Sequence, residues 1–262
     1  PQTRLVDLAK EYQLNAANGS EPVGTLFQGA RAMEERFPSW VAHWQAAGRD
    51  LASLQQISLL ACAWNDAVLK AGKQLYGPQA EPIEFLLPHG VFQVDCPLML
   101  MPGTFRATGG ATVLVVDPSD WAGAPGEALL HLAPWGTSAM AGRSLVVVGL
   151  TLEWGTPVNG MPTPHEGLRI DAPGGTVELE QLTVRGFSGT GIVLAGLEQS
   201  QAADLVLEGN GTGIALLGCT GDRHTFRNIT GGDNGTRFRT GPWGAYASDC
   251  NLFGADISLA AG

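Results

Sequence analysis

The pattern of apolar and polar positions divides the chain into two parts. In the first part apolar residues recur every three or four positions and glycine is rare, which is typical of amphipathic helices. This spacing predicts helices over residues 25–47 and 50–75. Asp50 is the expected N-cap of the second helix, and Gly72 is one expected stop signal. Trp40 and Trp44, one turn apart on the first helix, are interpreted as core residues of this region.

After Pro82 the pattern changes to short apolar runs bounded by glycine or proline. Runs this short and this closely spaced indicate an all-β array rather than alternating strands and helices. The first strands are expected at 83–87, 91–94, 98–101, 104–107 and 111–116. The change in pattern predicts a helical attachment or capping region over 1–78 and a β domain over 79–262.

An internal repeat runs through the second half of the chain. One family of segments starts with glycine and covers 167–170, 191–194, 213–216 and 235–238. A second family runs in phase with it and covers 150–153, 182–185, 205–208, 227–230 and, more loosely, 255–258. A unit of about 22 to 24 residues cannot bury its apolar face alone, so such units stack into a solenoid. The sequence therefore predicts a mainly β fold, a parallel β-helix.

Strand alternation assigns the side chains of the repeat to two faces. Alternate apolar residues are expected to point inward and stack on one another: Leu168, Ile170, Ile192, Leu194, Ile214, Leu216 and Phe238. The residues between them are expected to form one outward column: Arg169, Val193, Ala215 and Arg237.

A run of motifs resembles a known family. Trp64-Asn65-Asp66-Ala67 on a helix is followed by the apolar run at 85–94 with its Pro-His-Gly turn, and then by a glycine-rich turn at 108–114. This order resembles the opening of pectate-lyase-like right-handed parallel β-helices, and the resemblance covers about residues 60–262. Phage tailspikes and some polysaccharide lyases, hydrolases and epimerases share this opening. The resemblance implies a right-handed helix but selects no single activity.

Composition and charge narrow the partners. The chain has 15 Lys and Arg against 25 Asp and Glu, a net charge of −10, which argues against a nucleic-acid-binding surface. No apolar run approaches the roughly 18 residues of a membrane span, and no signal peptide is visible.

Four scattered cysteines are expected to be buried thiols: Cys62, Cys96, Cys219 and Cys250. No metal or cofactor is expected. Four glycosylation-type sequons are interpreted as turns: Asn18, Asn210, Asn228 and Asn234.

Three glutamates are weak catalytic candidates. Glu178 and Glu180 project from one face of a single strand, and paired carboxylates serve as acid and base in glycoside cleavage. Glu153 begins an outward column that continues with Arg185, Glu208 and Thr230. A surface ladder of ion pairs is the expected role of that column.

Two insertions between repeats carry carbohydrate-binding candidates. The first insertion, at 156–166, ends with His165 and Glu166, and Trp154 and Arg169 lie on either side of it. Aromatic rings stack on sugars, whereas carboxylates and guanidinium groups bond to hydroxyl or acid groups. The second insertion repeats this chemistry with Arg237, Arg239 and Trp243. His224, expected on an exposed turn with Asp222, is a weaker candidate.

Two functions fit these observations. The first is a phage or phage-like tail fibre or tailspike subunit, a homotrimer in the virion tail or outside the cell, which recognises a surface glycan. Its N-terminal region would attach to other tail or baseplate proteins. The alternative is a polysaccharide lyase, glycoside hydrolase or epimerase. The strand-like run at 256–261 is expected to be covered by another chain or by further sequence.

Overall fold

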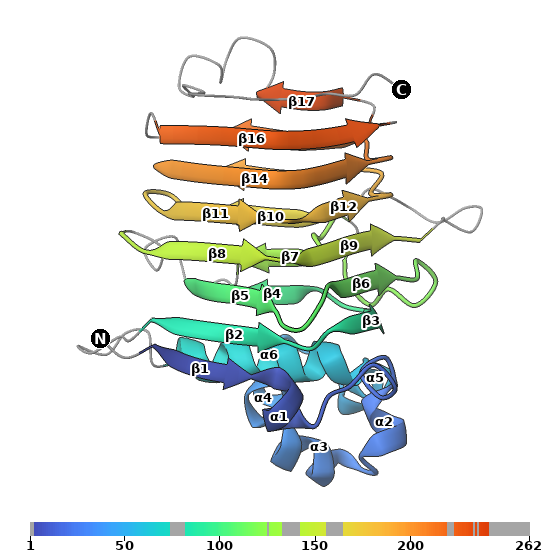
Figure 1. Cartoon of the computed structure of the whole chain (residues 1–262). Coiled ribbons are helices and arrows are strands. Elements are labelled where there is room, and N and C mark those ends of the chain that lie inside the picture. Colours follow the sequence, from blue (N-terminus) through green and yellow to red (C-terminus); the bar gives the residue numbers. More distant parts are fainter. Residues whose placement is uncertain are drawn as a thin grey trace.

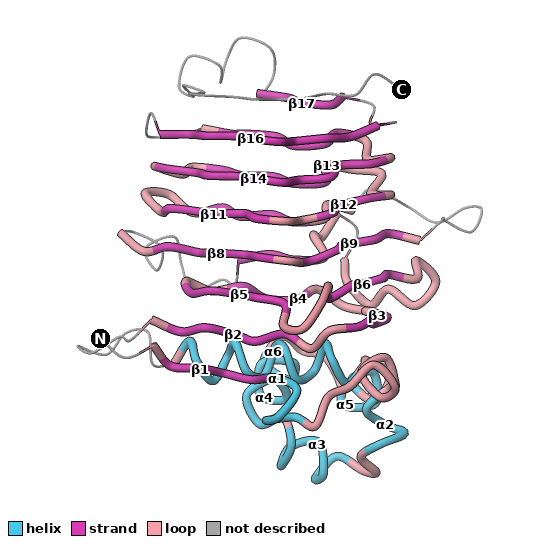
Figure 2. The backbone as a smooth tube through the Cα atoms, in the orientation of Figure 1, coloured by secondary structure: helices cyan, strands magenta, loops and turns pink. Residues whose placement is uncertain are grey.

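The computed structural model describes residues 3–73, 82–124, 126–132, 142–155, 165–218, 223–232, 234 and 236–240, with the backbone alone described at 236–240. The fold is mainly β, as predicted, because strands account for 42% of the structure and helices for 22%. The strands stack one above another, and the helices gather at one end of the stack (Figure 1). The same division is visible in the backbone trace of Figure 2.

Two sheets contain the strands of the described chain, and the strands within each sheet are parallel. The strands are β1 (Arg4–Asp7), β2 (Ile83–Leu87), β3 (Gly90–Gln93), β4 (Leu98–Leu100), β5 (Gly103–Ala107), β6 (Thr112–Val116), β7 (Leu130–Leu132), β8 (Ser144–Val148), β9 (Leu150–Trp154), β10 (Leu168–Asp171), β11 (Thr176–Glu180), β12 (Thr183–Arg185), β13 (Thr190–Ala195), β14 (Gln199–Glu208), β15 (Thr212–Leu217), β16 (Arg223–Gly232) and β17 (Thr236–Thr240). An 11-stranded sheet has the order β1-β2-β5-β8-β11-β14-β12-β9-β6-β3, with β16 paired to β14. A 6-stranded sheet has the order β17-β15-β13-β10-β7-β4.

The strand β1 was not predicted, since the N-terminal region was expected to be helical. It pairs in parallel with β2, in the register Arg4 with Ile83. The other predicted early strands agree with β2 to β6 within one or two residues. The first strand of the chain therefore belongs to the same sheet as the repeats.

The larger sheet bends at one corner in each repeat. β14 pairs with β11 through its first half and with β12 through its second half. At the bend Asp204 has φ of +57°, and Gly149, Gln181 and Asn228 hold the same position in neighbouring repeats with φ of +76°, +54° and +51°. Left-handed backbone is accessible to Gly, Asn and Asp more readily than to other residues. The Asn228 side chain also donates to the Asp204 carboxylate, which links two corners.

The inward stack was predicted correctly where its side chains are described: Leu168, Ile170, Ile192, Leu194, Ile214 and Leu216 are each at most 1% exposed. The outward column was predicted only in part. Val193 and Ala215 lie on the opposite face of the 6-stranded sheet but are also buried, because alternation assigns a face without determining what covers it.

Two registers differ from the prediction by two residues. Ile214 pairs with Phe238 and Ala215 with Arg239, so Arg239 rather than Arg237 continues the outward column. In the other sheet Val206 pairs with Thr230, so Thr230 does not follow Glu208. Both errors arise because the last repeat is 24 residues long rather than 22. A shift of two residues keeps every side chain on its face, so the apolar pattern alone cannot detect it.

The helices are shorter than predicted. They are α1 (Leu8–Tyr12), α2 (Val23–Leu26), α3 (Ala30–Arg36), α4 (Pro38–Ala46), α5 (Leu51–Leu54) and α6 (Leu59–Gly72). The predicted helix at 25–47 is broken at Gly29, which has φ of +87°, and at Pro38, which disfavours helical backbone in the residue before it. Asp50 caps the short α5, where its side chain accepts from the Ser53 N–H at 2.7 Å. Gly72 ends α6 as expected.

Helix α6 covers the first strands of the stack. Trp64 donates its Nε1–H to the Met99 carbonyl at 2.7 Å, and its ring stacks on Phe105 with centroids 5.5 Å apart. Asn65 accepts from the Met99 N–H at 2.8 Å and donates to the Pro97 carbonyl at 3.0 Å. These bonds tie the helix to β4, so Trp64 and Asn65 of the family-like motif have structural roles.

Asp66 of the same motif is a buried hub. Its carboxylate accepts from the Tyr12 hydroxyl at 2.8 Å and from the N–H groups of Ser39 and Trp40 at the start of α4, at 2.7 and 3.0 Å. Lys70 forms an ion pair with it at 2.6 Å. Burial, followed by the negative charge of Asp66, raises the pKa of Tyr12 well above its ordinary value. Asp66 therefore caps one helix from another.

The predictions about cysteines and membrane spans can be compared with the structure only at the described residues. Cys62 and Cys96 are buried free thiols, as predicted, and burial raises the pKa of both. Cys219 and Cys250 lie outside the described residues. Among the helices described here, none has the length and apolar character required to cross a bilayer.

Candidate functional site

The outer surface of six neighbouring strands forms one continuous face, which we call the long face. Its strands are β2, β5, β8, β11, β14 and β16, in spatial order. One column of paired residues consists of Glu84, Thr104, Val146, Glu178, Gln201 and Thr225. The adjacent column consists of Leu86, Arg106, Val148, Glu180, Ala203 and Arg227. At about 4.8 Å between strands, the long face extends for about 24 Å.

Strand alternation explains why these residues share a face. The residues between the two columns point inward, and Leu179, Ala202 and Phe226 are at most 2% exposed. Their burial fixes the register of β11, β14 and β16, which in turn holds the polar side chains of the long face outward. The core therefore positions the site.

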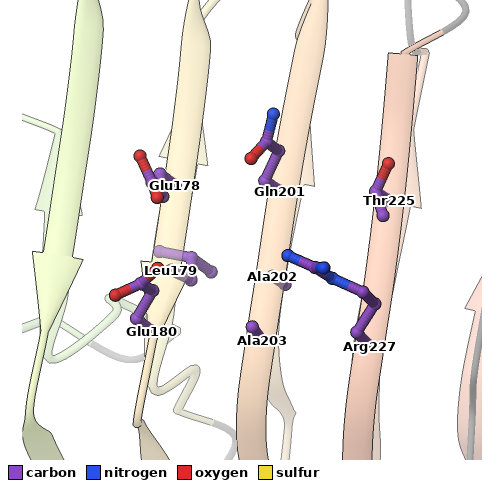
Figure 3. Close-up of a pocket in the computed structure, with 8 residues that line it drawn as sticks. All are labelled: Glu178, Leu179, Glu180, Gln201, Ala202, Ala203, Thr225 and Arg227. Carbon is purple, nitrogen blue, oxygen red and sulfur yellow. The ribbon is translucent and has the colours of Figure 1, made fainter.

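A shallow depression at one end of the long face contains the predicted glutamate pair. It is lined by Glu178, Glu180, Gln201, Thr225 and Arg227. Figure 3 shows the Arg227 side chain reaching across β14 toward β11, over the small residues of the middle strand. Carboxylate, amide, hydroxyl and guanidinium groups thus meet on three adjacent strands.

The two glutamates influence each other. Both are partly exposed, and burial raises the pKa of Glu178, with further contributions from the charge of Glu180 and a hydrogen bond to it. Like charges on neighbouring carboxyls favour the state in which one of them keeps its proton. Glu178 is therefore the carboxyl of this pair that is suited to donate a proton.

The other end of the long face has a wider depression. Its volume is about 490 Å³, and Glu84, Thr104, Arg106, Ser144 and Val146 are among its lining residues. Arg106 forms an ion pair with Glu84 at 3.0 Å. The apolar side chain of Val146 lies between this end and the glutamate end, so the long face alternates polar and apolar zones along its length.

Trp154 and His165 do not form the exposed stacking surface that was expected. Each is only 4% exposed, and their rings stack on each other with centroids 4.3 Å apart. Trp121 and Phe187 complete this aromatic cluster. The alternation of β9 turns Trp154 inward, so the residue type was suited to a sugar contact but its position places it in the core.

Glu166 and Arg169 lie together, as the sequence indicated, but they bind each other. Arg169 is 3.1 Å from Glu166 and 2.7 Å from Asp171, which leaves its guanidinium paired with two carboxylates. Both residues lie on the outside of the 6-stranded sheet or beside it, apart from the long face. A role in glycan binding stays a prediction for this pair.

Glu153 belongs to a different surface from Glu178 and Glu180. It forms an ion pair with Arg185 of β12 at 2.6 Å, as the predicted ladder requires. The next residue in the column is Glu208, which pairs in register with Arg185. This arrangement gives Glu153 a structural partner and leaves it outside the glutamate pair.

The candidates of the second insertion and of the C-terminal run lie partly or wholly outside the residues that the structure describes. The backbone of Arg237 and Arg239 is described but their side chains are not, and Trp243 and the strand-like run at 256–261 lie outside the described residues. His224 is not on a turn, because it is a fully buried residue of β16 that shares a hydrogen bond of 2.8 Å with Ser200. Within the described ranges, no group of three or more His, Cys, Asp or Glu is arranged to hold a metal ion.

Sequence reasoning missed Gln201, Thr225 and Arg227. The signal was present, since 176–180, 199–203 and 223–227 are paired in register at steps of 23 and 24 residues. Neither of the two aligned families includes these segments, and β14 and β16 each join two repeat segments into one long strand. Aligning this third family would have placed Arg227 in the column of Glu180.

In a comparison with known proteins, no protein-family model matches the chain and no curated protein matches it in sequence.

Proposed function

We propose that this chain is a right-handed parallel β-helix of the tailspike type and binds a surface polysaccharide along its long face. The parallel pairing supports the helix, because residues paired between β2 and β16 are 20 to 42 positions apart, from Glu84 with Thr104 to Gly103 with Leu145. Parallel crossover connections are almost always right-handed, which supports the hand.

The observation that carries this function is the composition of the long face. Polar groups that donate and accept hydrogen bonds lie at both ends, and apolar valines lie between them. A polysaccharide presents hydroxyl groups and apolar ring faces along an extended chain, so it matches a surface of this length and alternation. The rigid sheet holds these groups in place before binding, which lowers the entropic cost of association.

The tailspike proposal also specifies how the chain assembles and what it attaches to. In this proposal the chain forms a homotrimer in a virion tail or another extracellular setting, and its N-terminal region attaches to other tail or baseplate proteins. The gathering of the helices at one end of the stack supports this division, because the helices in the described part of the chain lie at that end and not along the stacked strands (Figure 2).

Polysaccharide cleavage is a second candidate function, favoured by the glutamate pair. A carboxyl with a raised pKa beside a second carboxyl is the arrangement that glycoside hydrolysis uses for its acid and its base or nucleophile. In this version Glu178 donates the proton to the leaving oxygen and Glu180 acts as the second carboxylate.

Calorimetric titration with a panel of bacterial surface polysaccharides tests the binding proposal. We expect one polysaccharide to bind, and we expect Arg227→Gln and Glu178→Gln each to weaken it about tenfold or more, because charged hydrogen bonds contribute about 1.5 to 3 kcal/mol. Arg31→Gln is the matched control, since Arg31 lies on α3 with a side chain 91% exposed. Binding that is equal in all variants would contradict the long face as the site.

The same panel separates binding from cleavage. Release of reducing ends or unsaturated products, abolished by Glu178→Gln, would establish the enzymatic version. Binding without product would leave recognition as the function. The mass in solution tests the assembly, and a monomer at all accessible concentrations would contradict the tailspike assignment.

A further inference from the structure

A second cavity lies where the helical region meets the 6-stranded sheet. Its volume is about 230 Å³. It lies between α4, with the turn that follows α4, and strands β4 and β7. The sheet contributes Met99 and His131, which are paired in register on the outer face of β4 and β7. The helical side contributes Trp40, His43, Trp44 and Arg49. The long face contributes none of the lining residues.

The aromatic wall of this cavity is held firmly. Trp40 stacks on His43 with centroids 5.5 Å apart, and Trp44 meets Trp40 edge to face at 5.3 Å. The Trp44 indole N–H donates to the Asp50 carbonyl at 2.8 Å. Because these rings are fixed by other contacts, the parts of Trp40 and Trp44 that line the cavity are preorganised.

The polar groups of the cavity have unused hydrogen-bonding capacity. The Arg49 guanidinium lies over the Trp44 ring at 4.6 Å and forms no ion pair within the described residues. Glu127 accepts a hydrogen bond from the Ala124 N–H and likewise has no cationic partner in the described part of the chain. The Nδ1 atom of His131 is buried and has no hydrogen-bond partner among the described residues.

The charges in the cavity select the kind of ligand. One guanidinium and one carboxylate balance each other, and burial lowers the pKa of both His43 and His131, with the Arg49 charge adding to the effect at His43. Both imidazoles are therefore neutral at pH 7. An anion would be repelled by Glu127 and a cation by Arg49, whereas a neutral polyol can donate to the carboxylate and accept from the guanidinium at once.

We propose that this cavity binds a single neutral sugar ring. The apolar face of the ring lies against Trp40 and Trp44, and its hydroxyls bond to Arg49 and Glu127. A neutral ring of this size satisfies the unpaired groups and leaves no charge unbalanced. The site is separate from the long face, so it does not depend on polysaccharide binding there.

Tryptophan fluorescence and calorimetry of the full chain, titrated with methyl glycosides of neutral hexoses, test this site. We expect saturable binding with a Kd on the order of 1 mM, as is usual for one small ligand. Arg49→Gln and Glu127→Gln are each expected to weaken it about tenfold or more, because each removes a charged partner of a hydroxyl. Arg31→Gln and Glu35→Gln, an exposed ion pair on α3, are the matched controls and are expected to change nothing.

Near-UV circular dichroism shows that each variant keeps its aromatic packing before it is titrated. Binding lost in both cavity variants but retained in Arg227→Gln would support a separate site. Three outcomes would overturn the proposal: no saturable binding of any neutral glycoside, equal binding in the cavity variants and their controls, or tighter binding of glucuronate or glucosamine than of their neutral counterpart.

Discussion

Individual residues in this chain were predictable by type more often than by role. Trp154 and His165 have side chains suited to a sugar, yet the alternation of β9 and the packing of Trp121 place both in an internal cluster. Glu178 and Glu180 were correctly assigned to one outer face. Their partner Arg227 was missed, because it comes from a strand two positions away in the sheet and 47 residues further along from Glu180, in a family of segments that was not aligned. Chemistry at a site depends on such distant neighbours.

Asp95 shows how one buried carboxyl makes stability depend on pH. It is 8% exposed, and burial raises its pKa from 3.8 to about 6, although it accepts hydrogen bonds from Ser58. The folded chain therefore holds the proton more tightly than the unfolded chain. The contribution of the Asp95 proton to the free energy of unfolding is fully present below about pH 4, and it is lost as the pH rises through about 6.

We therefore expect Asp95→Asn, which resembles the protonated residue, to be more stable than the natural chain at pH 7 by up to about 3 kcal/mol. The difference should disappear near pH 4. Urea unfolding at several pH values measures it, with the exposed Glu198→Gln as control. Parallel stability curves for Asp95→Asn and the natural chain from pH 4 to 7 would contradict this account.

At the scale of strands and helices, the existence of the repeats was predictable and their exact register was not. The glycine-led segments predicted β10, β13 and β15, because their apolar alternation has a clear period. The last register failed because a step of two residues preserves that alternation. The prediction of helix boundaries failed at Pro38, where the apolar pattern continues although the helix is interrupted in the backbone.

Asparagine side chains contribute to register where apolar packing cannot. The Asn210 side chain donates to the Val184 carbonyl at 2.9 Å and accepts from the Phe187 N–H at 3.1 Å. Asn234, 24 residues later, repeats this role by donating to the Leu207 carbonyl at 2.7 Å and accepting from the Asn210 N–H at 2.9 Å. Asn210 is 2% exposed, so it is buried too deeply to be a glycan acceptor in the folded chain, although it is not in a turn as the sequence predicted.

We expect Asn210→Ala to lower the free energy of unfolding by about 2 to 3 kcal/mol, since it leaves a buried carbonyl and a buried N–H without partners. Chemical denaturation measures the loss, and Glu198→Ala serves as an exposed control in the same part of the stack. A change below about 0.5 kcal/mol would show that these backbone groups find other partners.

At the scale of the whole molecule, helices and sheets share one hydrophobic core. The cluster of buried apolar residues runs without interruption from Val6 and Trp64 to Phe226 and Ile229. Trp64 lies where the two parts meet, because it is 1% exposed and contacts both Phe105 and the Met99 carbonyl. The expected division into an N-terminal region over 1–78 and a β domain over 79–262 stays a prediction, but the core joins the two.

We therefore expect Trp64→Ala to destabilise both parts together, by about 3 to 5 kcal/mol, because it removes a large buried side chain at their junction. Hydrogen exchange measured by peptide is expected to accelerate both in α6 and in β2 and β5. Leu5→Ala, at a residue that is 54% exposed, is the control. Faster exchange in the helices alone would mean that the stack is stable without its cap.

The pairing of β1 with β2 has a consequence for the order of events during synthesis. Arg4 and its partner Ile83 are 79 positions apart, whereas Ile192 and its partner Ile214 are 22 apart. The longer loop adds about 1 kcal/mol to the entropic cost of closure. At typical translation rates β1 also waits about 4 to 16 s on the ribosome before its partner is made. During that interval β1 lacks its partner strand. Helices formed from the residues between the two strands would shorten the distance that β1 must search for β2.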